Sequence, residues 1–323
     1  MTKFMKKEKT KNPIQPVSGT KVPRFAGPST FARLPEMRDV KSCDVAIVGI
    51  PFDAGTSYRP GARFGPQSIR QASRHLRTNY HPNYDIEPFK VQQVADAGDI
   101  VCNPFNINEA IQQIEKGALD LLNKVGGIIS MGGDHTIAFP LLKAVNKINK
   151  GPVALVHFAA HLDTWDTYFG APYTHGTPFR RAREENLFLD DASMHVGIRG
   201  PLYSTEDLKN DAEFGFKIIH CDEFQTEGID KIVKRIRDRV GNNALYLSID
   251  VDVLDPAFAP GTGTPEIAGL STREIVNVIR GLSGLNLISA DVVEVSPAYD
   301  HAEITSLAAA TIVYELTNLF ARK

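Results

Sequence analysis

Short apolar runs alternate with longer segments of helical periodicity along most of this chain. The runs are rich in Val, Ile and Leu and show little alternation with polar residues. Runs of this kind are typical of strands that helices cover on both faces of a parallel sheet. The strands predicted in this way are 44–50, 91–95, 127–131, 153–158, 195–198, 217–220, 244–249 and 287–293.

The segments between these runs carry apolar residues at helical spacing. Ser271-Thr-Arg-Glu274 also has the form of a capping box, which marks the start of a helix. The predicted helices are 107–124, 136–149, 229–240, 275–282 and a long amphipathic helix at 303–320. Repeated strand–helix units indicate one doubly wound α/β domain over residues 41–323. Residues 1–40, rich in Lys, Pro and Gly, predict an N-terminal arm or cap.

Composition and charge narrow the class of protein. The 323 residues are 42% hydrophobic and 23% charged, which is ordinary for a soluble globular protein. A net charge of −2 lacks the excess of basic residues that is typical of nucleic-acid-binding proteins. No apolar run approaches the length of a membrane span. We therefore expect a soluble enzyme or binding protein with neither nucleic acid nor membrane as a partner.

Cysteine usage and the N-terminus bear on location. The three cysteines, Cys43, Cys102 and Cys221, are scattered, which favours a reducing compartment over a disulfide framework. The basic residues 1–11 lack the apolar core of a secretory signal and predict a disordered tail. We expect a cytoplasmic protein, with an organelle address in this basic stretch as the alternative.

Polar residues with metal-binding chemistry follow four of the predicted strands. In an open parallel sheet, ligands bind beyond the carboxyl ends of the strands, so these side chains are expected to meet at one edge. A turn, a helix cap or a solvated strand end explains each of them alone, but four such coincidences at one edge indicate a site. The residues are His135, His161, Asp163, Asp250, Asp252 and Glu294.

The stretch around His161 has one position without a ligand atom. His161 and Asp163 are two residues apart and share one face of extended backbone, and Ala159 shares that face. The donors are carboxylates and imidazoles with no thiolate nearby, which suits Mn²⁺, with Ni²⁺ or Fe²⁺ as alternatives. The candidate metal positions, His135, His161, Asp163, Asp250, Asp252 and that of Ala159, number six, which is too many for one metal with an open site. A bridged pair of metals about 3.5–4 Å apart fits better.

Four motifs of this chain together resemble those of the ureohydrolase family, which includes arginases and agmatinases. They are Gly132-Gly-Asp-His135, Ala159-Ala-His-Leu-Asp163, Ser248-Ile-Asp-Val-Asp-Val-Leu-Asp-Pro256 and Val293-Glu-Val-Ser-Pro297. Three further stretches, 55–66, 175–181 and 259–266, resemble the agmatinase and guanidino-acid hydrolase branch. The similarity covers almost all of residues 40–320.

The resemblance implies a three-layer α/β/α fold of the arginase/deacetylase type, with an eight-stranded, mainly parallel sheet. It also implies a binuclear Mn²⁺ site, with Ni²⁺ as the alternative. By motif match, His135, Asp163 and Asp250 would hold one metal. His161, Asp250 and Asp252 would hold the other, so that Asp250 bridges the pair.

Three more positions acquire roles from the resemblance. His175 matches the histidine that shuttles a proton, and Glu294 matches the carboxylate that holds the substrate guanidinium. The position of Ala159 is normally a second bridging aspartate. The implied reaction is hydrolysis of a guanidino compound to urea and an amine by a hydroxide that bridges the metals. We also expect a homo-oligomer, a hexamer or trimer, from the resemblance alone.

The motifs do not distinguish among several possible substrates. Agmatine and a guanidino acid such as 4-guanidinobutyrate share the guanidinium group and differ at the far end. Other guanidino acids, guanidine and formimidoyl compounds also stay open. We expect specificity to depend on the N-terminal arm and on residues 164–182.

Ala159 affects the activity expected of this chain but not the predicted fold. Without its bridging carboxylate we expect weak or partial metal loading and little hydrolysis, and two Mn²⁺ per subunit only once an aspartate is restored. Because every other ligand and both catalytic residues remain, we interpret Ala159 as an engineered substitution in a working enzyme. The alternative is a natural, non-catalytic subunit of a mixed ureohydrolase oligomer. A deacetylase and a pure binding module fit the intact His175 and Glu294 less well.

Other conspicuous residues receive structural interpretations. His157, inside a predicted strand, is expected to be a core histidine whose hydrogen bonds are satisfied. Arg59 and Arg63, in a glycine-rich loop, are expected to be ion-pair partners, with contact to an acidic substrate tail as the alternative. Trp165 and Tyr168 either line the mouth of the site or simply pack.

Overall fold

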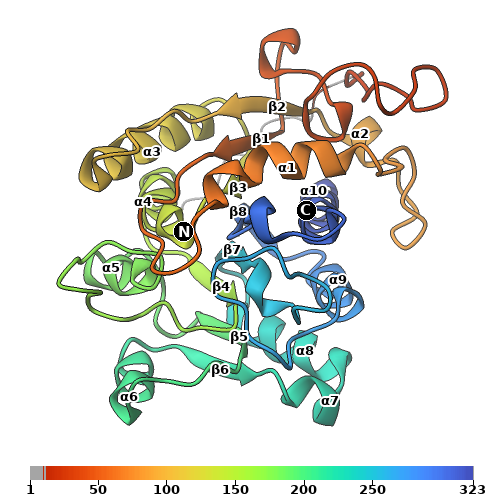
Figure 1. The fold of residues 1–323 in the computed structure, drawn as a ribbon. Helices are drawn as coiled ribbons and strands as arrows, with labels where there is room; N and C mark the ends of the chain where they lie inside the picture. Colours follow the sequence, from red (N-terminus) through yellow and green to blue (C-terminus); the bar gives the residue numbers. More distant parts are fainter. Residues whose placement is uncertain (1–9, 11, 323) are drawn as a thin grey trace.

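A single parallel sheet crosses the centre of the computed structural model, which describes residue 10 and residues 12–322 (Figure 1). Its strand order is β2-β1-β3-β8-β7-β4-β5-β6, and every neighbouring pair is parallel. The strands are β1 Val45–Ile50, β2 Val94–Asp99, β3 Gly127–Gly132, β4 Ala154–Phe158, β5 Met194–Ile198, β6 Lys217–His220, β7 Ala244–Asp250 and β8 Asn286–Val293. The predicted eight-stranded α/β fold is confirmed.

Helices cover both faces of this sheet and make three layers (Figure 1). On one face lie α3 Ile107–Leu122, α4 Ala138–Asn149 and α5 Pro178–Glu184. On the other lie α1 Gly65–Ser73, α8 Ile229–Val240, α9 Thr272–Gly281 and α10 Ile304–Ala321. Each face has its own apolar cluster of strand and helix side chains, so the sheet is buried on both sides. The remaining α-helices are α2 Pro88–Val91, α6 Thr205–Glu213 and α7 Glu223–Glu227.

The second predicted strand is displaced along the chain. We predicted 91–95, but Val91 ends α2, and β2 runs on through Ala97-Gly98-Asp99. The polar end of β2 breaks the apolar pattern, which is why that pattern placed the strand too early. The other strand boundaries agree with the prediction to within one residue.

The last helix is not amphipathic, which corrects the prediction for 303–320. Fifteen of the 18 residues of α10 are buried, because the helix packs against the sheet, α1 and α9. Oε1 of its buried Glu315 lies 3.1 Å from His81 Nε2 and 2.6 Å from Arg280 Nη2. The helix is long and apolar enough to cross a membrane, but 83% of that window is buried inside the protein, as in a core helix.

Capping side chains and a proline mark the starts of three helices, including two whose apolar pattern is weak. The capping box of Ser271 and Glu274 is present at the start of α9. A second one, of Ser204 and Asp207, begins α6, and a proline in the first turn begins α1. The apolar pattern predicted neither α1 nor α6, since each has only nine residues and few apolar positions.

The described part of the N-terminal arm packs as irregular chain with two 3₁₀ turns, Phe31–Arg33 and Met37–Asp39. The Ile14 backbone N–H donates to the Gln93 side chain at 2.7 Å, and that of Phe31 donates to Asp96 at 2.7 Å. The arm therefore lies along the β2 edge. The prediction of a disordered tail at residues 1–11 falls outside the described residues except for Thr10, and the domain division at residue 40 stays a prediction.

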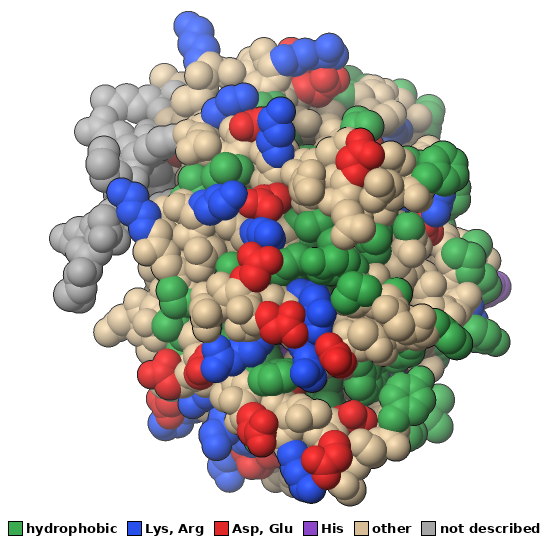
Figure 2. Space-filling view, turned by 90° about the vertical axis from the view of Figure 1, so that its left-hand side faces the viewer, with side chains coloured by type: hydrophobic (Ala, Val, Ile, Leu, Met, Phe, Trp, Pro, Cys, Tyr) green, Lys and Arg blue, Asp and Glu red, His purple; other side chains and the backbone are tan. Residues whose placement is uncertain are grey.

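The face over α3, α4 and α5 presents lysine, arginine, aspartate and glutamate side chains in a mixed pattern (Figure 2). Lys143 lies 3.1 Å from Glu185, and Arg183 lies 2.9 Å from Asp190. Exposed pairs of this kind stabilise a protein by at most about 1 kcal/mol each. The helical layer is therefore held mainly by its buried apolar side.

Candidate active site

Four neighbouring strands, β3, β8, β7 and β4, bring the predicted site residues to one edge of the sheet. Their carboxyl ends adjoin because the strands are parallel and central, as expected for a ligand site in an open α/β sheet. The residues are His135 after β3, His161 and Asp163 after β4, Asp250 and Asp252 at the end of β7, and Glu294 directly after β8, with His175 in the loop between β4 and α5.

The first group of metal-type donors surrounds His135. Its Nδ1 lies 2.8 Å from Asp163 Oδ2 and 3.2 Å from Asp250 Oδ2. Its Nε2 lies 2.8 Å from Ser248 Oγ, which donates its own proton to Asp291. Ser248 therefore accepts from His135 Nε2–H, and this orients Nδ1 toward the two carboxylates, as an outer hydrogen bond does for a metal-binding histidine.

The second group surrounds Asp252. Its Oδ2 lies 2.8 Å from His161 Nδ1, and its Oδ1 accepts the backbone N–H of Ala160 at 2.8 Å. The Asp252 backbone N–H donates to Asp250 Oδ1 at 2.8 Å, which joins this group to the first. Burial lowers the pKa of His161, but Asp252 more than offsets this and raises it to about 10.

The crowded carboxylates indicate a cation site. Burial, then the nearby charge of Asp252, raises the pKa of Asp250 well above its usual range. A divalent cation would stabilise these charges, and the carboxylate and imidazole donors suit it. The residues present thus suit one or more divalent cations. Ala159 is buried in the same segment and provides only a methyl group.

Two of these residues have left-handed backbone. Asp163 has φ of 55° and Glu294 has φ of 67°, a conformation that non-glycine residues rarely adopt. Such strain costs about 1–3 kcal/mol per residue and persists where the surrounding structure holds it, commonly at functional sites. The Glu294 backbone N–H is held by Gly133 O at 2.9 Å, and Asp163 O accepts the Phe179 N–H at 3.1 Å.

Glu294 and His175 form a pair beside the donors. Glu294 Oε1 lies 3.0 Å from His175 Nδ1 and accepts the His135 backbone N–H at 2.9 Å. His175 Nε2 accepts the Ser57 backbone N–H at 3.2 Å and lies 2.7 Å from Ser57 Oγ. Burial lowers the pKa of His175, but the charge and hydrogen bond of Glu294 outweigh burial and raise it to about 9.

We expect NMR titration of the metal-free protein to give a His175 pKa near 9. Because this pKa lies above the unfolded value of about 6.5, the pair stabilises the fold fully below that pH, and the contribution is lost as pH rises through about 9. Glu294→Gln removes the main raising cause, so the pKa of His175 should be lower in that variant than in the unsubstituted chain. A midpoint at or below about 6.5 in the unsubstituted chain would contradict this assignment.

Asp134 supports the site and was not predicted from the sequence. It is buried and accepts the backbone N–H groups of Gly55 at 2.8 Å and Thr136 at 3.0 Å. It thereby fixes the glycine-rich loop that carries Ser57. Burial, then the charge of Glu294, raises its pKa to about 7. Its place beside His135 in the Gly-Gly-Asp-His motif was the available signal.

Arg199 also supports the site and was not predicted. It directly follows β5, and its guanidinium donates to the carbonyls of Asp252 and Glu266, each at 2.7 Å. A planar guanidinium can hold several carbonyl groups at once, so Arg199 ties the loop after β7 to the segment that carries Glu266. Its position immediately after a strand was the only sequence signal.

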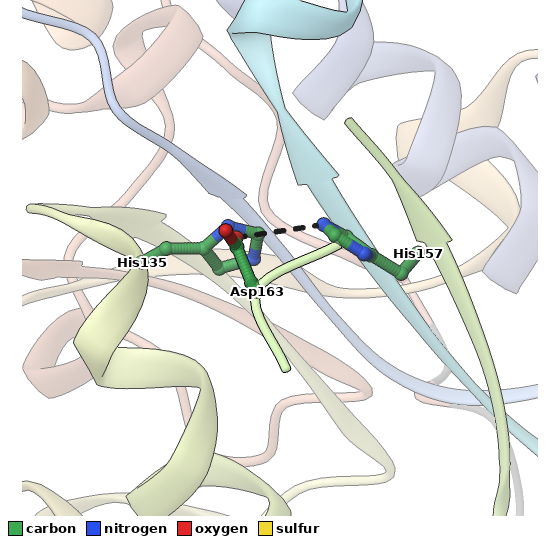
Figure 3. Close-up of side chains that lie close together, drawn as sticks. All are labelled: His135, His157 and Asp163. Atoms are coloured by element: carbon green, nitrogen blue, oxygen red, sulfur yellow. Dashed lines mark ion pairs between the residues drawn. The ribbon is translucent and has the colours of Figure 1, made fainter. Parts of the chain in front are cut away.

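His157 is buried as predicted, yet only one of its nitrogens is satisfied. Nδ1 lies 2.8 Å from His195 Nδ1, and His195 in turn lies 3.0 Å from Asp211. Nε2 has no hydrogen-bond partner in the described part of the chain and points toward Asp163 Oδ2 at 3.9 Å (Figure 3). One ligand atom each from His135, His157 and Asp163 lie within 4.8 Å of one another, so these three are able to hold a metal.

A cavity of about 890 Å³ opens over the donors, which is large enough for a small-molecule substrate. Trp165 lies in its wall, with ring centroids 5.7 Å from Tyr168 and 5.6 Å from Tyr203. Trp165 and Tyr168 therefore line the mouth rather than pack in the core. Residues 165, 167–169 and 175–176, within the expected segment 164–182, line the cavity together with 201–203 and 264–266, and no described residue of the N-terminal arm does. Which of these segments sets specificity stays a prediction.

The two loop arginines differ. Arg63 forms the predicted ion pair, with Asp53. Arg59 lines the cavity and forms no ion pair with any described residue, so that part of the prediction is wrong. Its guanidinium lies 5.0 Å from the ring centroid of Tyr299, in cation–π geometry.

Known proteins resemble this chain along nearly its whole length. The model of the Arginase family matches residues 43–318. Guanidinopropionase from Pseudomonas aeruginosa is 44% identical, with 95% of this chain and 96% of the relative covered. Putative agmatinase 1 from Schizosaccharomyces pombe is 45% identical, over 92% of this chain and 83% of the relative. The solved structure of proclavaminate amidino hydrolase from Streptomyces clavuligerus has a TM-score of 0.89 at 40% identity, covering 93% of this chain and 99% of that one.

Proposed function

This chain belongs to the arginase family, and on that premise we propose that its site hydrolyses a guanidino acid to urea and an amine. One observation carries the proposal. The buried Glu294 carboxylate lies beside the metal-type donors, and its Oε1 lies 3.0 Å from His175 Nδ1. A carboxylate can accept two N–H groups of a planar guanidinium, which holds the reacting carbon next to the donors.

The arginase family depends on a binuclear metal centre. We assign His135, Asp163 and Asp250 to one metal, and His161 and Asp252, with Asp250, to the other. Mn²⁺ suits these donors, with Ni²⁺ or Fe²⁺ as alternatives. When bound, such a pair supplies a nucleophile from water at neutral pH.

His175 handles the proton. In the protonated ring, Nε2–H lies 2.7 Å from Ser57 Oγ, which can accept it, and Nδ1–H faces Glu294 at 3.0 Å. A guanidinium held by Glu294 lies beside this proton, which His175 delivers to the leaving amine. The raised pKa keeps the ring protonated at neutral pH, as a general acid requires.

Arg59 favours a guanidino acid over agmatine. It is a cation at the cavity wall without an ion-pair partner among the described residues, and a substrate carboxylate would supply one. Besides the aspartates among the metal-type donors, Glu266 lines the same cavity, and it already faces His161 Nε2 at 3.5 Å. Agmatine, whose far end is an amine, stays the second candidate because Glu266 and the aromatic rings could receive a cation.

Arg59→Met should separate the two substrate types. In a metal-loaded Ala159→Asp background, we expect kcat/KM for 4-guanidinobutyrate to fall about 10-fold, because a charge-assisted hydrogen bond to the substrate is lost. The value for agmatine should stay the same or rise. Arg38→Met, an exposed arginine of the arm, is the matched control. A fall for agmatine alone would reverse the assignment of substrate.

The proposed function is tested by urea release from a panel of guanidino compounds. The panel holds agmatine, 4-guanidinobutyrate, 3-guanidinopropionate, arginine and guanidine, with a formimidoyl compound as the alternative class. We expect the Ala159→Asp protein to release urea from at least one guanidino acid. Turnover confined to the formimidoyl compound, or none in the panel despite full metal loading, would refute the proposal.

Two further proposals rest on family resemblance and composition. We propose that the chain is a homo-oligomer, a trimer or hexamer, which light scattering measures directly. We also propose a cytoplasmic location, in line with its three free cysteines.

A further inference from the structure

A second cavity, about 390 Å³ in volume, lies between the N-terminal arm and the segment that follows α1. It shares no lining residue with the aromatic cavity over the donors. Among the described residues that line it there is no aspartate or glutamate, but there are four arginines: Arg24, Arg33, Arg74 and Arg77. Positive charges gathered without a counter-charge repel one another, and a bound anion would stabilise them.

Arg33 is the buried member of this group. Its residue is only 3% exposed, and its Nη1 donates to the Val22 carbonyl at 3.1 Å. Its Nε and Nη2 are closed off from solvent and have no hydrogen-bond partner among the described residues. A buried charge without a partner is costly, so the positive charge of Arg33 favours an anion in the adjoining cavity.

The other arginines complete the cavity. Arg74 is a fixed part of the wall, because its guanidinium donates to the carbonyls of Arg24 at 3.2 Å and Pro28 at 3.1 Å. Arg24 is half-buried, Arg77 is exposed, and neither forms an ion pair with a described residue. The guanidinium groups thus range from the buried Arg33 to the exposed Arg77.

The neutral groups of the lining also suit an oxyanion. Ser18, Thr20 and Thr78 add hydroxyls to the wall, and Ser18 Oγ lies 2.8 Å from Thr20 Oγ1. The carboxylate that contacts a lining residue, Asp85, accepts from the Tyr80 hydroxyl at 2.9 Å and is not itself in the wall. Guanidinium forks with hydroxyl donors are the groups with which proteins bind phosphate.

We propose that this cavity binds a phosphate group, from inorganic phosphate or from a small phosphorylated metabolite, at a site separate from the active site. The volume lies near the lower end of the range of small-molecule sites, about 300–1,000 Å³. It leaves room for a short organic group attached to the phosphate. The proposal is independent of the hydrolytic function, since the two cavities have no residue in common.

Calorimetric titration of the full chain with inorganic phosphate tests the site, with ionic strength held constant by chloride. We expect saturable binding that weakens about 10-fold or more in Arg24→Ala and in Arg77→Ala, each of which removes one charged donor. Both substitutions are outside the buried core, so the fold should be kept. Arg38→Ala, an exposed arginine of the same arm that pairs with Glu36 at 2.9 Å, should bind phosphate like the unsubstituted chain.

A parallel titration with glycerol 3-phosphate distinguishes the two sources. Tighter binding than inorganic phosphate supports a metabolite, and equal binding supports the free ion. Absence of saturable binding at constant ionic strength would overturn the proposal. Binding that both Arg24→Ala and Arg77→Ala retain would also overturn it, because the phosphate would then lie elsewhere, for example among the metal-type donors. A change of oligomeric state in these variants without any effect of phosphate would identify the cavity as a subunit contact instead.

Discussion

Ala159→Asp is expected to raise the rate of urea release more than about 100-fold in protein loaded with Mn²⁺. Loss of an outer hydrogen-bond partner of a metal ligand already costs about 10–100-fold in affinity or activity, and a bridging ligand contacts the metals themselves. The aspartate would add a negative charge between two dications whose repulsion few other charges screen. Steady-state urea assays at saturating metal measure the gain.

Ala159→Asn is the matched control, because it has nearly the same volume and no charge. If the negative charge of the aspartate causes the increase in the rate of urea release, the increase with asparagine should be at least about 10-fold smaller. A large gain with aspartate supports the interpretation of Ala159 as a substitution in a working enzyme. Equal and measurable rates of urea release in the unsubstituted chain and in the Ala159→Asp protein would contradict the role given to this position. If both are inactive although fully loaded, the alternative of a non-catalytic subunit gains support.

His175→Asn, made in the Ala159→Asp background, is expected to lower kcat by about 10²–10⁴-fold, the usual contribution of a positioned general acid. The asparagine keeps a polar group near Glu294 and Ser57 but cannot deliver a proton to the leaving amine. KM should change much less than kcat, since Glu294, which holds the guanidinium in this account, is retained. Added imidazole should restore part of the rate.

His220→Asn provides the control for that experiment. His220 ends the edge strand β6 and is exposed, so its replacement should leave kcat unchanged. If His175→Asn kept the kcat of its parent, or raised KM alone, His175 would be a binding group and the proton would come from elsewhere.

The site motifs could be predicted from the sequence because each directly follows an apolar strand. Residues such as His135, Asp250 and Glu294 stand at strand ends, and parallel strands place their ends at one edge. The apolar pattern found all eight strands for the same reason, since sheet residues covered on both faces are almost uniformly apolar.

Residues that act through tertiary contacts could not be predicted. Arg199 holds the carbonyls of Asp252 and Glu266, which are more than 50 positions away along the chain. His157 was assigned to the core from its place in a strand, whereas the approach of Asp163, whose loop turns back through left-handed backbone, directs one nitrogen to the site. The burial of α10 likewise depends on its packing against helices α1 and α9, and the sequence of α10 alone does not reveal these neighbours.

The number of tightly bound metal ions per chain tests the central claim most directly. Elemental analysis after extensive desalting should find two ions in the Ala159→Asp protein and fewer than two in the chain with Ala159. This difference follows if the donors form a two-metal site from which one bridging carboxylate is missing. Two tightly retained ions per chain in the protein with Ala159 would contradict the account.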